Sequence, residues 1–131
     1  FYLLINLKNV MANHIIFIIG TKPNLEHPEK SHLFLSDEGD TVVKPGDHVI
    51  WINMVASISS FIIVDDNRKK GKKVDDPNSG VFAPDPKLVP GSNIWEGHVR
   101  KDIKKGEEHY AICWSQDGMT YRYDPVIKVN T

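Results

Sequence analysis

Residues 110–114 read Tyr-Ala-Ile-Cys-Trp, and residues 121–129 read Tyr-Arg-Tyr-Asp-Pro-Val-Ile-Lys-Val. Both runs are rich in aromatic and β-branched residues, and the short loop between them is typical of a β-hairpin. Because successive side chains of a strand point to opposite faces, Tyr110, Ile112 and Trp114 share one face, whereas Cys113 points to the other. We therefore predict a closing hairpin that buries the large apolar set.

The second run behaves as one half-buried strand with its bulky residues on a single face. That face carries Tyr121, Tyr123, Pro125, Ile127 and Val129. Because Pro125 has no N–H to donate to a neighbouring strand, its position predicts a sheet edge or a bulge.

The rest of the chain also follows a period of two rather than the helical period. Strands are expected at residues 14–19, 32–35, 41–43, 48–53, 60–64 and 94–99. Residues 44–47 (Lys-Pro-Gly-Asp) form the pattern of a type II turn, and residues 65–93 are typical of a long loop. Many short strands with regular turn signals predict an all-β protein, an antiparallel β-sandwich with one domain over residues 11–131.

Composition narrows the function classes. The chain has 131 residues, 40% of them hydrophobic, and a formal net charge of -1, so no bulk charge attracts it to nucleic acid or an anionic membrane. The basic run 68–73 is flanked by acidic pairs and carries no aromatic residue, which is typical of a solvated loop. No stretch reaches the ~18 apolar residues of a membrane span. The single cysteine favours a reducing compartment, so we predict a cytoplasmic protein, with the periplasm or secretion as the alternative.

Residues 1–10 precede the first methionine, Met11, and consist of types such as Phe, Tyr, Leu, Ile, Asn and Lys. Every residue of this segment except Val10 can be encoded by a codon made only of A and T. We interpret the segment as a possible non-native leader, with a genuine N-terminal arm or strand as the alternative. A signal-peptide remnant fits less well, because the apolar run is interrupted and no basic start is present.

Two motifs resemble the cupredoxin family of blue-copper proteins. Residues 43–53 carry the pattern Val-x-Pro-Gly-Asp-x-Val-x-Trp-x-Asn, which is similar to the strand pair before the first copper ligand of plastocyanin-like proteins. The Gly106-x-x-x-Tyr110 pattern, followed by a strand, a loop and a last strand, resembles the C-terminal end of that family. The resemblance implies a Greek-key cupredoxin-like β-sandwich, and an immunoglobulin-like sandwich is the competing architecture.

The same resemblance implies a copper site whose ligands this chain lacks. Blue copper takes two imidazoles, a thiolate and a weak axial thioether. The first family histidine matches a position near Ser60, and no histidine occurs between Asn53 and Gly97. Matching by residue type aligns Cys113, Gln116 and Met119 with the C-terminal ligand cluster, again without a histidine.

Strand register weakens that match further. The family tyrosine stands four residues before its copper cysteine on the same face, which puts Trp114 at the cysteine position. We therefore predict no type-1 copper and no cofactor. If copper binds after all, the expected set is Cys113 and Met119 with His109 or His98.

Catalysis has no visible machinery in the sequence. Cys113 has no neighbouring base that would lower its pKa, and paired carboxylates occur only as sequence neighbours that face opposite ways on a strand. We therefore predict a non-catalytic binding module for an unknown protein or small ligand. Two alternatives stay open: a copper-binding electron-transfer or copper-carrier protein with an unorthodox site, and a hydrolase or transferase on a sandwich scaffold.

Loops on a rigid sandwich commonly carry recognition, and aromatic residues are enriched at binding surfaces. The expected contact surfaces are the 65–93 loop and the tip at residues 114–119. The candidate interaction residues are Phe82, Trp95, Gln116, Asp117 and Met119.

Overall fold

A computed structural model describes residues 11–65 and 80–131. The prediction of an all-β protein is confirmed, since these residues form eleven strands and one turn of 3₁₀ helix. The interpretations of residues 1–10 and of the basic run 68–73 lie outside the described residues, as does most of the predicted 65–93 loop. The elements are β1 (Asn13–Lys22), η1 (Pro28–Lys30), β2 (His32–Leu35), β3 (Asp40–Val43), β4 (His48–Asn53), β5 (Ile58–Val64), β6 (Lys87–Leu88), β7 (Ile94–His98), β8 (Gly106–His109), β9 (Ala111–Gln116), β10 (Met119–Tyr123) and β11 (Val126–Val129).

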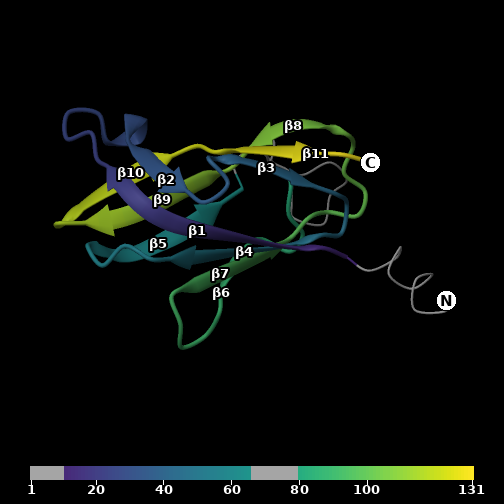
Figure 1. The fold of residues 1–131 in the computed structure, drawn as a ribbon, viewed down its shortest axis with the longest axis horizontal. Helices are drawn as coiled ribbons and strands as arrows, with labels where there is room; N and C mark the ends of the chain where they lie inside the picture. The colour runs from purple at the N-terminus through teal and green to yellow at the C-terminus, as the bar shows by residue number, and fades with distance from the viewer. Residues whose placement is uncertain (1–10, 66–79) are drawn as a thin grey trace.

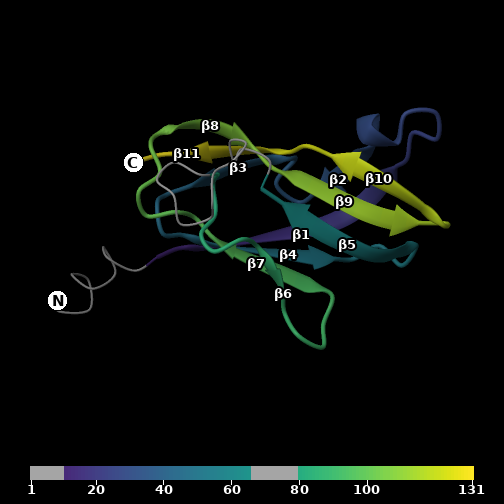
Figure 2. The ribbon, with the colours of Figure 1, turned by 180° about the vertical axis from the view of Figure 1, so that it is seen from behind.

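The strands form three sheets arranged as a β-sandwich. One has five strands in the order β2-β1-β4-β7-β6, and two have three strands each, in the orders β10-β9-β5 and β3-β11-β8. The chain passes directly from β8 into β9 and from β10 into β11, so the small sheets follow one another. Figures 1 and 2 show β6 and β7 along one side of the molecule and β8 and β11 along the opposite side.

The sheets are mixed, so the prediction of an antiparallel sandwich is wrong at two places. Strand β1 pairs with β4 in parallel, with Ile16 beside Trp51, and β11 pairs with β3 in parallel. Side-chain alternation has the same period in both pairings, so the sequence pattern carries no sign of strand direction.

The final hairpin is shorter than predicted. Strands β9 and β10 are joined by Asp117 and Gly118, whose φ angles of 51° and 77° are those of a type I′ turn. The prediction of one strand over residues 121–129 is wrong, because the chain leaves the hairpin after Tyr123 and pairs elsewhere as β11. The break lies at Asp124 and Pro125, where the missing N–H of proline interrupts pairing.

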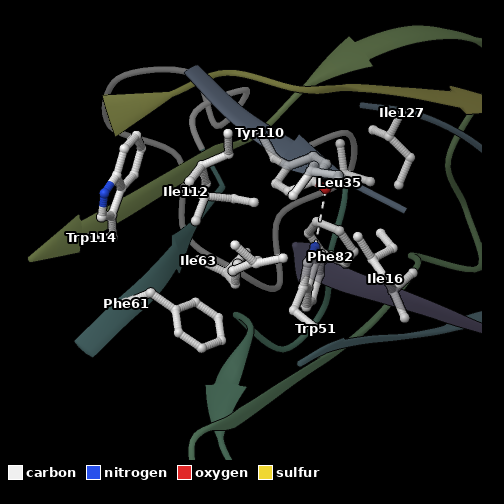
Figure 3. Packing of buried hydrophobic residues seen from close by; sticks show 14 of the residues in the cluster. Ile16, Leu35, Trp51, Phe61, Ile63, Phe82, Tyr110, Ile112, Trp114 and Ile127 are labelled. Carbon is white, nitrogen blue, oxygen red and sulfur yellow. Dashed lines mark hydrogen bonds between the residues drawn. The ribbon is translucent and has the colours of Figure 1, made fainter. Parts of the chain in front are cut away.

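The core lies between the sheets, and it confirms the predicted inward face of β9. Tyr110, Ile112 and Trp114 are exposed by only 1%, 0% and 1%. At the centre, Trp51 Nε1 donates a hydrogen bond of 3.0 Å to the Tyr110 hydroxyl, drawn as the dashed line in Figure 3. Burial raises the pKa of Tyr110, so the hydroxyl stays protonated and remains available as the acceptor.

Among the described residues, no helix has the length and apolar character that crossing a membrane requires.

Candidate functional site

The position that the cupredoxin resemblance assigns to the copper cysteine is filled by an indole. Trp114 is buried, its ring lies 5.6 Å from the ring of Tyr121, and its Nε1 donates a 3.1 Å hydrogen bond to Gln116 Oε1. Gln116 Nε2 in turn donates to Ser57 Oγ at 3.1 Å. The indole therefore has both its apolar surface and its N–H satisfied within the fold.

The position expected for the first copper histidine lies next to the cross-strand partner of this indole. Ser60 pairs with Ser115, and Phe61 pairs with Trp114 across β5 and β9. Ser60 is exposed, whereas Phe61 and Trp114 are buried on the other face of the sheet, and none of these four residues offers an imidazole or a thiolate. The residues present do not fit type-1 copper.

Cys113 points away from this position. It pairs with Arg122 on one side and with Ile62 on the other, opposite to the face that carries Trp114. Burial, and then the carboxylate of Asp124, raise the pKa of the Cys113 thiol above its ordinary value. A protonated thiol is a poor nucleophile and a poor metal ligand, which favours the interpretation of Cys113 as an inert side chain.

The alternative copper set is not brought together either. Met119 lies on the face of Tyr121, whose hydroxyl is 3.5 Å from the Met119 sulfur, so the methionine and Cys113 occupy opposite faces of the hairpin. His109 ends β8 and His98 ends β7, in different sheets. Within residues 11–65 and 80–131, no group of three His, Cys, Asp or Glu side chains is placed to hold a metal ion.

The predicted interaction residues fall into two groups. Phe82 is fully buried, its ring 5.6 Å from that of Trp51, so in the described structure it offers no exposed surface for a contact. Trp95 is half-buried and shares the inward face of Trp51. Sequence alone could not separate an aromatic residue that closes the core from one that lies on the surface.

The remaining three candidates lie together at the tip of the β9–β10 hairpin. Gln116 and Met119 are cross-strand partners on either side of the turn, and Asp117 is exposed within it. Only Met119, exposed by 38%, offers a large apolar side chain there. The tip is therefore a tight turn that offers only a small apolar surface.

A larger surface, which sequence reasoning missed, covers the outside of the five-stranded sheet. Its residues alternate with buried ones such as Ile16, Val49 and Trp51, so they point away from the core. We call it the outer apolar face, and it consists of Ile15, Phe17 and Ile19 of β1, Ile50 and Ile52 of β4, and Ile94 of β7.

Strand register makes this face continuous. Phe17 pairs with Ile52, and Ile52 pairs with Ile94, so one apolar row crosses three strands. Ile15 pairs with Ile50 in a second row, which continues to the charged residue Glu96 on β7. Ile15 is exposed by 52% and Ile19 by 59%. The signal was present in the sequence, because residues 15–19 are apolar without a break instead of alternating with polar residues.

One end of the face is polar. Asn13 pairs with His48, and His48 pairs with His98, whose ring stacks on it at 4.5 Å with the planes 6° from parallel. His48 Nδ1 lies 3.1 Å from Asn13 Oδ1, and its Nε2 lies 3.3 Å from Glu96 Oε2. Because imidazole lone pairs lie in the ring plane, the lone pairs of two rings stacked face to face run side by side and do not converge on one metal ion.

Asp47 ties the start of β1 to the turn before β4. Its carboxylate accepts hydrogen bonds from the backbone of Ala12 at 3.1 Å and of Lys44 at 2.8 Å, and His14 Nε2 lies 2.8 Å from it. Burial opposes the charge, but these hydrogen bonds outweigh it and lower the pKa of Asp47 below its ordinary value. The carboxylate thus holds the start of β1 to the turn before β4, next to the polar end of the outer apolar face.

No protein-family model matches the sequence, and a search of curated proteins finds no significant match. What the protein does must therefore be inferred from the arrangement of its own side chains.

Proposed function

We propose that this chain is a non-catalytic, copper-free β-sandwich of the cupredoxin type that binds another molecule through its outer apolar face. The observation that carries the proposal is the exposure of Ile15 and Ile19, at 52% and 59%, on a central strand. Contiguous apolar side chains on a sheet face have the composition of the core of an interface.

The membership of the cupredoxin family is supported by where the two motifs lie. The Pro-Gly-Asp turn at residues 45–47 leads directly into β4, and the Gly106-x-x-x-Tyr110 pattern forms β8 and the approach to β9. Phe61, the residue after Ser60, is the cross-strand partner of Trp114, so the segment of the first expected ligand runs beside the segment of the second. The Greek-key connection of the strands belongs to the same proposal.

The copper-free part of the proposal is supported by the packing of Trp114. Its indole fills the ligand position, while Cys113 and Met119 lie on opposite faces of the hairpin. The raised pKa of Cys113 supports the non-catalytic part, because it keeps the thiol protonated.

Copper titration of the full, reduced chain tests the copper-free part of the proposal. We expect no intense thiolate-to-copper absorption band and no stoichiometric copper after dialysis. A retained, coloured copper that disappears in Cys113→Ser would contradict the proposal and favour the electron-transfer alternative. Met119→Leu is the matched control at the hairpin tip, since an axial thioether tunes such a band without creating it.

A further inference from the structure

We infer that the molecule bound by the outer apolar face is a second copy of this chain, packed sheet against sheet across a two-fold axis. The inference rests on the proposed function, because it uses the same face and names its partner. Three observations favour a second copy: the distribution of residues on the face, its size and its charge.

The distribution is self-complementary. In face-to-face packing of two sheets, a two-fold axis that runs parallel to β1 and β4 and passes between them preserves positions along the strands and places β1 of each copy opposite β4 of the other. Ile15 then meets Ile50 of the second copy, and Phe17 meets Ile52. The polar ends with Asn13 and His48 meet as well, and Glu96, which continues the row of Ile15 and Ile50, lies on β7 outside this contact.

The composition of the central strands requires a cover. Strands β1 and β4 form a parallel pair that is apolar on both faces, with Ile16 and Trp51 inside and Ile15 and Ile50 outside. Parallel strands of this kind occur in sheets that are buried on both sides. Within one chain, the described strands cover only the inner side of this sheet.

The size of the face fits a small interface that forms in a concentration-dependent way. Strands β1, β2, β4, β7 and β6 contain 10, 4, 6, 5 and 2 residues, and at about 4.8 Å between strands and about 3.3 Å per residue along each strand they cover at most roughly 430 Å². A specific interface of standard size buries about 800 Å² on each partner, and smaller interfaces are weak or transient. We therefore expect two chains to associate reversibly through this face.

The charge of the face favours a second copy over an anionic membrane or an acidic partner. Glu96 lies beside the face on β7 and pairs across the strands with Lys87, so their charges offset each other. The chain as a whole carries a formal net charge of -1, which gives two copies little mutual repulsion. A membrane-binding face would instead need a rim of basic residues.

Mass measurement of the full chain in solution tests the inference. Light scattering coupled to size exclusion, over about a hundredfold range of concentration, is expected to approach twice the chain mass of 14.9 kDa at the upper end. The Ile15→Arg variant places a charge in the apolar row and is expected to weaken association by at least about tenfold, with a single-chain mass throughout.

Ile62→Arg is the matched control. Ile62 is also an isoleucine in a strand and is exposed by 47%, close to the 52% of Ile15, but it belongs to β5 in another sheet. We expect this variant to dimerise like the unmodified chain. Far-ultraviolet circular dichroism and a urea midpoint verify folding, and Ile19→Arg serves as the second variant if Ile15→Arg is unfolded.

The inference is overturned by a single-chain mass at every concentration, by a dimer that survives Ile15→Arg and Ile19→Arg, or by a dimer that Ile62→Arg dissociates equally. A single-chain mass does not touch the copper titration, so failure of the dimer and failure of the proposed function are distinguishable. Shielding of the Ile15 side chain at a single-chain mass would also overturn the inference, because the cover would then be a segment of the same chain.

Discussion

The β9–β10 hairpin and the β1–β4 pair differ in how many of their two faces are apolar. On the hairpin, Trp114 and Tyr121 point into the core, while Cys113 and Arg122 point out, so one face is apolar and the other is mixed. On β1, the residues on both sides of the strand are apolar. The first pattern suits a sheet with one solvated face, and the second suits a sheet that is covered twice.

The largest effect is expected from emptying the inward face of the hairpin. Trp114→Ala removes a buried indole and is expected to lower the free energy of unfolding by about 3–5 kcal/mol. Cys113→Ser, one residue away on the outward face, is expected to cost about 1 kcal/mol or less. Urea denaturation monitored by circular dichroism compares the two, and equal losses would break the distinction between the faces.

A similar contrast across β1 should depend on protein concentration. Ile16→Ala opens a cavity at a site exposed by 2% and is expected to cost about 2–5 kcal/mol at any concentration. Ile15→Thr keeps the β-branched shape and is expected to change stability only where the chains associate. Denaturation curves at low and high protein concentration separate the two, and a large concentration-independent loss for Ile15→Thr would show that its side chain packs within the chain.

The β1–β4 pair is held by a buried carboxylate, so it should weaken in acid. The pKa of Asp47 is lowered from 3.8 in the folded state, so its contribution is complete above pH 3.8 and is lost as the pH falls through the folded value. Asp47→Asn replaces an acceptor oxygen by a donor and is expected to cost about 1–3 kcal/mol at neutral pH.

The difference between the unmodified chain and Asp47→Asn should therefore shrink in the acid range, which urea midpoints at several pH values measure. Asp117→Asn is the control, because Asp117 is exposed in the hairpin turn. A stability difference that stays constant through the acid range would show that the charge of Asp47 does not stabilise the contact between the start of β1 and the turn before β4.

The hairpin is held by its turn, and this predicts the smallest effect. Gly118 has a φ of 77°, and a Cβ added to it would meet nothing within 4 Å, so only the backbone preference is lost. Gly118→Ala is expected to cost about 1–2 kcal/mol, and Gly118→Asn less, because asparagine tolerates this region. The midpoint of thermal unfolding measures this effect, and equal midpoints for the unmodified chain and Gly118→Ala would contradict the type I′ assignment.

The sequence was sufficient where a local rule decides the outcome. Alternation placed Tyr110, Ile112 and Trp114 in the core, and turn chemistry located the approach to β4. The Asp117-Gly118 pair is a strong two-residue hairpin signal and locates the turn between β9 and β10, while Pro125 marks the place where the predicted last strand is interrupted.

The sequence was insufficient where distant segments decide. Parallel pairing of β1 with β4 and the burial of Phe82 against Trp51 depend on contacts between strands far apart in the chain. The outer apolar face also needed the register of three strands, although the unbroken apolar run at residues 15–19 pointed to it.

The most direct test asks whether solvent reaches the outer apolar face. Isoleucine methyl groups of the full chain would be labelled, and their signal loss on adding a soluble paramagnetic probe measured by nuclear magnetic resonance. Ile15, Ile19 and Ile62 have similar exposures of 52%, 59% and 47% in the single chain. We predict that Ile62 is attenuated while Ile15 and Ile19 are protected, and equal attenuation of all three would contradict the account.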